Sequence, residues 1–198
     1  MLTSAKGLRA FCDELASAEP SPGGGTAAAA AGAMAASLLS MVCGITLKNK
    51  KHEGNWSKLA VLKEESDALS SLLLRLAADD ALAYDKVVET TRAKRTAPAD
   101  GKAVTAYADA VRVAMEVPMS TAEACVKVLR LSENVASTGT KSASSDIEVA
   151  RRLAGAGVDG ALANVLINLP YCMDASFAST AKGKAEELRR ERRQTLAP

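Results

Sequence analysis

Asp80 is the residue whose type and position most directly suggest chemistry. Across residues 69–87, apolar side chains recur at helical spacings of three, four and seven, and Asp80 falls on the same stripe. A carboxylate held among aliphatic side chains needs hydrogen-bond donors, a cation or a raised pKa, and each of these suits proton transfer. Asp79 and Asp85 lie off the stripe and are predicted to be surface acids. A structural ion pair between Asp80 and a facing helix is the alternative.

Three consecutive glycines, Gly23, Gly24 and Gly25, stand before Thr26 and an alanine-rich segment. Each glycine weakens a helix by roughly 1 kcal/mol relative to alanine, but together they expose backbone N–H groups that attract anionic or electron-rich groups. No lysine follows at the spacing of a phosphate-binding P-loop. The pattern therefore predicts either close approach of a ligand or tight packing of a neighbouring helix.

A third group of polar residues lies between positions 145 and 168. Asn164 and Asn168 share a helical stripe with small residues, and their amides both donate and accept hydrogen bonds, as recognition of a heterocycle edge requires. An amide contact between helices explains them equally well. Ser145 is predicted to cap a helix, and Asp146 to lie in its first turn, where the helix dipole favours an acid.

Long helices are needed to position these residues, and the sequence predicts them. Strand-like alternation is absent, and prolines, glycines and polar clusters separate the helical segments. Residues 48–55 are expected to form a polar loop, and Pro118 to kink or restart a helix, with a capping box at Ser120 and Glu123 just beyond. We expect an all-α, up-and-down bundle of about six helices in a single domain, residues 1–198. The expected helices cover residues 3–18, 26–47, 56–94, 102–136, 145–169 and a last segment ending near 193.

Composition narrows the classes of partner. Of 198 residues, 48% are hydrophobic and only 3% aromatic, so the core must be built from small aliphatic side chains. A net charge of +2 predicts neither a nucleic-acid nor a membrane partner. The four cysteines are scattered and there is one histidine, which argues against a zinc site or a disulfide framework. Without a recognisable signal peptide, we expect a cytoplasmic protein with no metal or redox cofactor.

Several segments, in this order along the chain, resemble one family of folate enzymes. They resemble the C-terminal domain of formiminotransferase–cyclodeaminases and the stand-alone methenyltetrahydrofolate cyclohydrolases. The similarity covers most of the chain, and its ordered combination is more specific than alanine-rich helices alone. The segments are SPGGGTAAAAAGAMAASLLSMVCGIT, KNKKH, ADDALAYDKVV, SSDIEVA and ALANVLINL.

This resemblance implies a helical homodimer that acts on a tetrahydrofolate derivative as its small-molecule substrate. The family's reactions are hydrolysis of 5,10-methenyltetrahydrofolate to 10-formyltetrahydrofolate, and cyclisation of 5-formiminotetrahydrofolate with loss of ammonia. Asp80 matches the family's acidic residue and is expected to be the acid/base. Lys50 and Lys51 match loop lysines, which would bind the folate carboxylates or, for Lys51 in particular, polarise the reacting centre. The residues expected to shape the pterin site are Gly24, Gly25, Ser145, Asp146 and Asn164.

Departures from the family pattern fall in loops. Residues 139–142 are Gly-Thr-Lys-Ser where the family has Gly-Asn-x-Asn, and residues 93–95 replace a Leu-Pro-Lys turn. Asn49 and His52 stand where the family has lysine and tyrosine. Because 198 residues cannot also hold a formiminotransferase domain, a free-standing cyclohydrolase is the leading expectation. The alternatives are a catalytically inactive folate-binding or assembly module, and an enzyme of this fold acting on another cyclic amidine.

Overall fold

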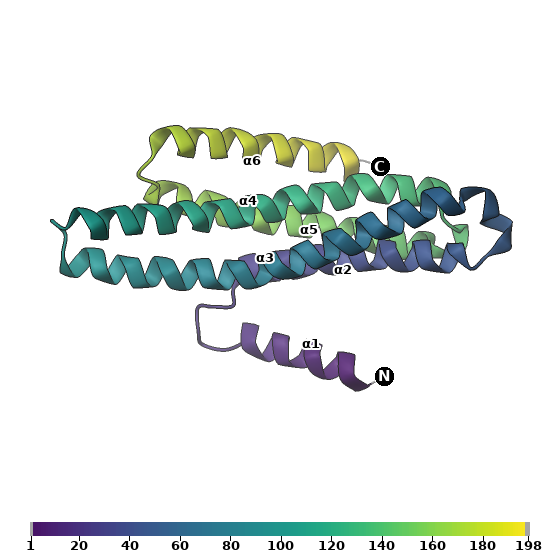
Figure 1. The fold of residues 1–198 in the computed structure, drawn as a ribbon, viewed down its shortest axis with the longest axis horizontal. Coiled ribbons are helices and arrows are strands. Elements are labelled where there is room, and N and C mark those ends of the chain that lie inside the picture. The colour runs from purple at the N-terminus through teal and green to yellow at the C-terminus, as the bar shows by residue number, and fades with distance from the viewer. Residues whose placement is uncertain (1, 197–198) are drawn as a thin grey trace.

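The computed structural model describes residues 2–196, and within them it contains six α-helices and no strand (Figure 1). The prediction of an all-α bundle of about six helices is confirmed. Three short 3₁₀ helices fill connections between them. The α-helices are α1 (Leu2–Leu15), α2 (Gly24–Leu47), α3 (Trp56–Thr96), α4 (Gly101–Thr138), α5 (Ser144–Asn168) and α6 (Ala175–Leu196).

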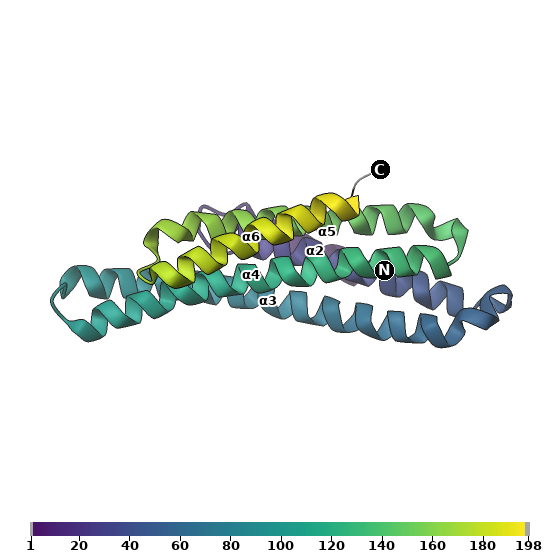
Figure 2. The ribbon, with the colours of Figure 1, turned by 90° about the horizontal axis from the view of Figure 1, so that it is seen from above.

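Helices α2 to α5 form the body of the molecule. Each packs against the next along the chain, and α5 returns to α2, so the four helices enclose a common core. In Figure 2, α6 lies over α4 and α5. In Figure 1, α1 stands away from the bundle at the end of an extended connection. The body thus leaves one side of α2 and α3 facing α1.

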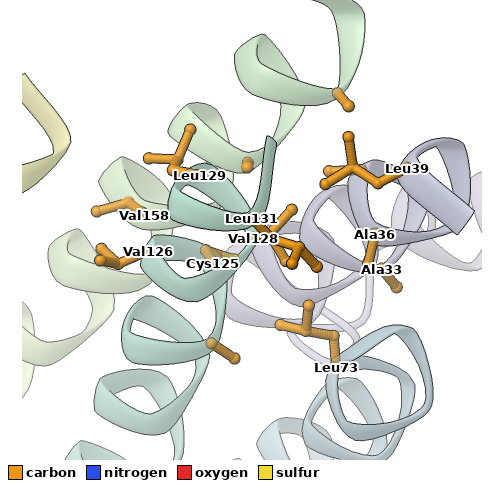
Figure 3. Packing of buried hydrophobic residues seen from close by; sticks show 14 of the residues in the cluster. Ala33, Ala36, Leu39, Leu73, Cys125, Val126, Val128, Leu129, Leu131 and Val158 are labelled. Atoms are coloured by element: carbon orange, nitrogen blue, oxygen red, sulfur yellow. The ribbon is translucent and has the colours of Figure 1, made fainter. Parts of the chain in front are cut away.

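Small residues let α2, α4 and α5 approach closely. A Cβ atom added at Gly32 would lie 2.5 Å from the Cys125 Sγ, and one added at Gly157 would lie 2.7 Å from the same sulfur. Around this contact the core is aliphatic, with Leu39, Leu73 and Val128 fully buried (Figure 3). The scarcity of aromatic residues is therefore compensated by short distances between helices.

Of the two outcomes expected at Pro118, a kink or a restart, the restart does not occur, and one predicted helix start is wrong. Helix α4 continues through Pro118 as far as Thr138, so no new helix begins at Ser120. Pro118 is buried, and the packing of α4 in the bundle holds the helix together where local sequence favours a break. Helix α5 begins at Ser144 with Ala143 in the capping position, so Ser145 lies within the first turn and is not the cap.

The expected polar loop at 48–55 is also partly wrong, because residues Lys50–Asn55 form a 3₁₀ helix, η1. The Asn49 side chain caps it by accepting a hydrogen bond from the Lys51 backbone N–H at 3.1 Å. The segments α2 and Lys141–Tyr171 are long and apolar enough to cross a membrane by composition alone. In α2, 56% of the apolar window is buried inside the bundle, which accounts for its composition.

Candidate functional site

Asp80 lies on the inward stripe of α3 and faces the first turn of α2. Its carboxylate accepts a hydrogen bond from the Thr26 hydroxyl at 2.9 Å. Gly23, at the N-cap position of α2, has no side chain to cap that helix. Asp80 therefore supplies, from a neighbouring helix, the acceptor that the start of α2 lacks. Among the described residues no lysine or arginine forms an ion pair with Asp80, so the ion-pair alternative does not hold.

The surroundings of Asp80 make its ionisation less favourable than that of an exposed carboxyl. Burial raises the pKa of the Asp80 carboxyl above its usual value, while hydrogen bonds from the Thr26 hydroxyl and backbone N–H offset part of the rise. Asp79, the next residue along α3, is exposed, as is Asp85. Of the three acids at positions 79, 80 and 85, Asp80 alone is half-buried, and it lies beside the glycine turn. A buried carboxyl with a raised pKa is suited to exchange a proton.

Glycine is required at position 25 by the closeness of Asp80. A Cβ atom there would lie 2.2 Å from the Asp80 Oδ1, well inside contact distance. Gly24 is exposed, and a Cβ atom added to it would lie 3.7 Å from the Asn164 Nδ2. The glycine turn thus lies between the carboxylate of α3 and the amide of α5.

Two asparagines of α5 border the same space. The Asn164 Nδ2 donates to the Gly160 carbonyl at 2.9 Å. The Asn168 Nδ2 donates to the carbonyls of Asn164 and Ala114, each at 3.0 Å. Both side chains are half-buried. The hypothesis of a contact between helices is thus correct for Asn168, which joins α5 to α4.

A cavity of about 350 Å³ joins these groups. Its wall combines the Asp80 carboxylate and the two amides with apolar side chains and two tyrosines. Tyr84 and Tyr171 were not predicted, although Tyr84 follows Asp80 by four residues and so shares its helical face. Tyr171 lies in the short helix η3 (Leu169–Tyr171), where no periodicity marks it. The remaining lining residues are Pro20, Ser21, Gly23, Gly24, Gly25, Ala83, Val87, Ala114 and Ile167.

The other predicted site residues lie at the opposite end of the bundle. Lys50 and Lys51 follow the C-terminal end of α2, whose 24 residues span about 36 Å. Ser145 and Asp146 begin α5, about 28 Å from Asn164 along that helix. The Thr140 N–H donates to the Thr46 hydroxyl at 3.1 Å, which ties this start of α5 to the lysine end of α2.

Within this chain, then, the predicted residues form two groups. One group surrounds the cavity and consists of Gly24, Gly25, Asp80 and Asn164. The second group, Lys50, Lys51, Ser145 and Asp146, is exposed or half-buried at the far end. The roles assigned to both groups stay predictions.

A second and larger hollow lies on the side of the bundle that faces α1. This trench has a volume of about 890 Å³ and runs between α1, α2 and α3, with an almost wholly apolar wall that includes Met34, Met41 and Leu74. Those three side chains are 47%, 41% and 59% exposed. Asp80 and the asparagines do not border the trench; they line the smaller cavity.

Known proteins are similar to this chain over most of its length. The family model of formiminotransferase-cyclodeaminase matches residues 7–187. A methenyltetrahydrofolate cyclohydrolase from Methylorubrum extorquens is 36% identical over 182 residues, which cover 91% of this chain and 88% of that protein. The formimidoyltransferase-cyclodeaminase of Sus scrofa is 31% identical over 94% of this chain but only 35% of its own length.

A solved structure shares the fold. The crystal structure of formiminotetrahydrofolate cyclodeaminase from Thermotoga maritima superposes with a TM-score of 0.85 at 29% identity, covering 95% of this chain and 90% of that one. The likeness in fold covers 95% of this chain, and the family match over residues 7–187 spans the positions of the glycine turn, Asp80 and the asparagines of α5. The chain therefore belongs to the formiminotransferase-cyclodeaminase family.

Proposed function

We propose that this protein is a folate one-carbon enzyme whose main reaction is hydrolysis of 5,10-methenyltetrahydrofolate to 10-formyltetrahydrofolate. The observation that carries the proposal is the half-buried Asp80 carboxylate, held by Thr26 at the wall of a cavity without a competing cation. The substrate ring carries a positive charge at the reacting carbon, which a nearby carboxylate stabilises. The cyclohydrolase from Methylorubrum extorquens matches this chain along 88% of its own length, which supports hydrolysis over cyclisation as the main reaction.

The chemistry needs one group that takes and returns a proton. Water attacks the methenyl carbon, a C–O bond forms, and the proton leaves the water for the Asp80 carboxylate. The neutral ring intermediate then opens: the carbon–N5 bond breaks, N5 takes the proton from Asp80, and the hydroxyl releases its proton to solvent as the formyl C=O forms. One water is consumed, one proton is released and Asp80 returns to its ionised form.

Cyclisation of 5-formiminotetrahydrofolate is the second candidate, and the likeness to the Thermotoga maritima cyclodeaminase favours it. In that reaction N10 attacks the formimino carbon and its proton passes to the former imino nitrogen. That nitrogen then takes a second proton from Asp80, its bond to the carbon breaks, and ammonia leaves the 5,10-methenyl cation behind. The same carboxyl serves as donor, because burial keeps its pKa above the usual value. Both reactions pass through a tetrahedral carbon between N5 and N10, and neither needs a metal or redox cofactor.

The proposal includes a cytoplasmic homodimer with a site built from two protomers. Lys50 and Lys51 lie one α2 length from Asp80, too far to act in the same protomer. The apolar trench beside α1 is the face that a second copy would cover, because Met34 and Met41 expose hydrophobic surface near the middle of α2. A two-fold axis there would set the two α2 helices antiparallel and bring the partner's loop lysines toward Asp80.

The test is the loss of absorbance of 5,10-methenyltetrahydrofolate, corrected for its spontaneous hydrolysis. We expect the wild-type protein to accelerate the reaction and Asp80→Asn to abolish most of the acceleration. If the wild type has no effect on methenyl hydrolysis or formimino cyclisation but tetrahydrofolate raises its melting temperature, the protein is the folate-binding module instead. Acceleration that survives Asp80→Asn would remove this residue from the mechanism.

A further inference from the structure

Pro118 breaks the backbone ladder of α4 beside the cavity. Proline has no N–H, so the carbonyl four residues earlier, that of Ala114, receives no hydrogen bond from position 118. The proline is buried in the middle of a 38-residue helix, where this residue type is costly. Ala114 also borders the cavity that contains Asp80. The freed carbonyl is therefore located at the proposed site.

Asn168 supplies the hydrogen bond that Pro118 withholds. Its Nδ2 lies 3.0 Å from the Ala114 carbonyl and 3.0 Å from the Asn164 carbonyl. Both partners are acceptors, so only the NH₂ end of the amide can face them, and both of its N–H groups are used. The orientation of the Asn168 amide is thus fixed by two backbone carbonyls, one of which is free because position 118 is proline.

The other end of this amide has no partner of its own. Among the described side chains, the Asn168 Oδ1 accepts no hydrogen bond, and it is not one of the buried atoms left without a partner. Asn168 borders the cavity and its Nδ2 is engaged by two backbone carbonyls, which leaves Oδ1 as the polar atom of this side chain for a molecule bound there. A fixed carbonyl-type oxygen at this wall is complementary to an N–H donor on a bound ring.

We propose that Asn168 is a substrate-recognition residue that accepts a hydrogen bond from a ring N–H of the ligand, and that Pro118 is its positioning residue. Pro118 acts through the Ala114 carbonyl and never touches the ligand. The ligand class is a nitrogen heterocycle with an N–H donor on one edge, as in the pterin of a folate, so the inference rests on the proposed function. A role confined to joining α4 and α5 would predict effects on stability alone.

Two single variants and their combination separate these roles. In Pro118→Ala the new N–H at position 118 bonds the Ala114 carbonyl, so the melting temperature should hold or rise while KM for 5,10-methenyltetrahydrofolate increases about threefold. In Asn168→Ala the acceptor is gone and KM should increase about tenfold, which is typical of a lost hydrogen bond to a polar ligand group. Asn134→Ala, an exposed asparagine near the other end of α4, is the matched control and should change neither quantity.

The double variant makes the result decisive. Asn168→Ala alone leaves the Ala114 carbonyl without a partner and should lower the melting temperature; adding Pro118→Ala should restore that temperature but leave KM at the Asn168→Ala value. Wild-type KM in Asn168→Ala overturns the recognition role, and wild-type KM in Pro118→Ala overturns the positioning role. Calorimetric titration with tetrahydrofolate distinguishes failure of the proposed function from failure of the Asn168 inference alone. If the wild-type protein neither binds tetrahydrofolate nor turns over substrate, the proposed function and this inference are both wrong.

Discussion

Asp80 combines two tasks in one carboxyl group, because it caps the start of α2 and is the proposed proton carrier. At neutral pH, burial works against its ionised form, as the raised pKa shows. A group whose pKa is raised in the folded state binds its proton more tightly when folded, so its ionisation above that pKa costs stability. Asp80→Asn keeps an acceptor for Thr26 and removes the charge.

We therefore expect Asp80→Asn to lower the rate by about 10²–10⁴-fold while raising the melting temperature at neutral pH. The neighbouring exposed acid provides the control, since Asp79→Asn should leave the rate unchanged. Rate measurements and thermal unfolding on the same preparations check both parts. A variant that loses activity because it unfolds would contradict this account.

The hydroxyl of Thr26 tunes the same carboxyl. Thr26→Val removes a hydrogen bond that lowers the pKa of Asp80, so that pKa should rise further. Since the carboxylate must be ionised to accept a proton from water, activity falls as pH decreases through this pKa. The acidic limb of the pH–rate profile should therefore move to higher pH in Thr26→Val, and an unmoved limb would show that another group sets it.

Position 25 is the most restrictive point of the glycine turn. Gly25→Ala places a methyl group where the Asp80 oxygen now lies, so either the carboxyl or the helix start must move. We expect a loss of about 1–3 kcal/mol in unfolding free energy together with loss of activity. Gly183→Ala in α6, where an added Cβ would meet nothing within 4 Å beyond its chain neighbours and the backbone of its own helix, should instead stabilise by about 0.5–1 kcal/mol. Chemical denaturation of both variants measures the difference.

At the scale of the elements, Cys125 lies where α2, α4 and α5 approach one another most closely through small residues. Its thiol is buried between Gly32 and Gly157, and burial raises its pKa to about 12, which makes it a packing group and a poor nucleophile. Gly32→Ala should cost about 1–3 kcal/mol by forcing these helices apart. Adding Cys125→Ala makes room for the new methyl group and should recover part of that loss, as denaturation of the single and double variants would show.

Helix positions were predictable because the stripes of apolar residues are long and regular. The expected helix 56–94 matches α3, and the stripe containing Asp80 correctly predicts that this carboxylate faces inward. Local signals misled where packing outweighs them: Pro118 and the Ser120–Glu123 pair indicate a restart, yet contacts along α4 hold one helix. Tyr171 and the bond between Asn168 and Ala114 depend on how α5 meets α4, which no spacing within one segment reveals.

At the scale of the molecule, the two groups of predicted site residues are separated by the length of α2. This separation has a direct test by subunit mixing. Asp80→Asn and Lys51→Ala should each be inactive alone. When equal amounts of the two variants are unfolded together and then refolded, the mixture should regain about a quarter of wild-type activity. Half of the dimers then contain one chain of each kind, and each of these mixed dimers holds one intact site out of two. A Lys51→Ala variant that is active alone would place Lys51 outside the site, whereas two inactive variants that regain nothing on mixing would show that Asp80 and Lys51 do not combine across protomers. Size measurement of Met34→Glu and Met41→Glu would check whether the trench joins the copies.

The cap on α2 has one further consequence. A carboxyl that has just received a proton is a weaker acceptor for the Thr26 hydroxyl and N–H, so its hold on residues 24–26 loosens at that moment and tightens when the proton departs. The first turn of α2 would then open and close once per catalytic cycle, as Asp80 gains and loses its proton. Local fraying at the start of α2 would therefore be coupled to proton transfer at Asp80.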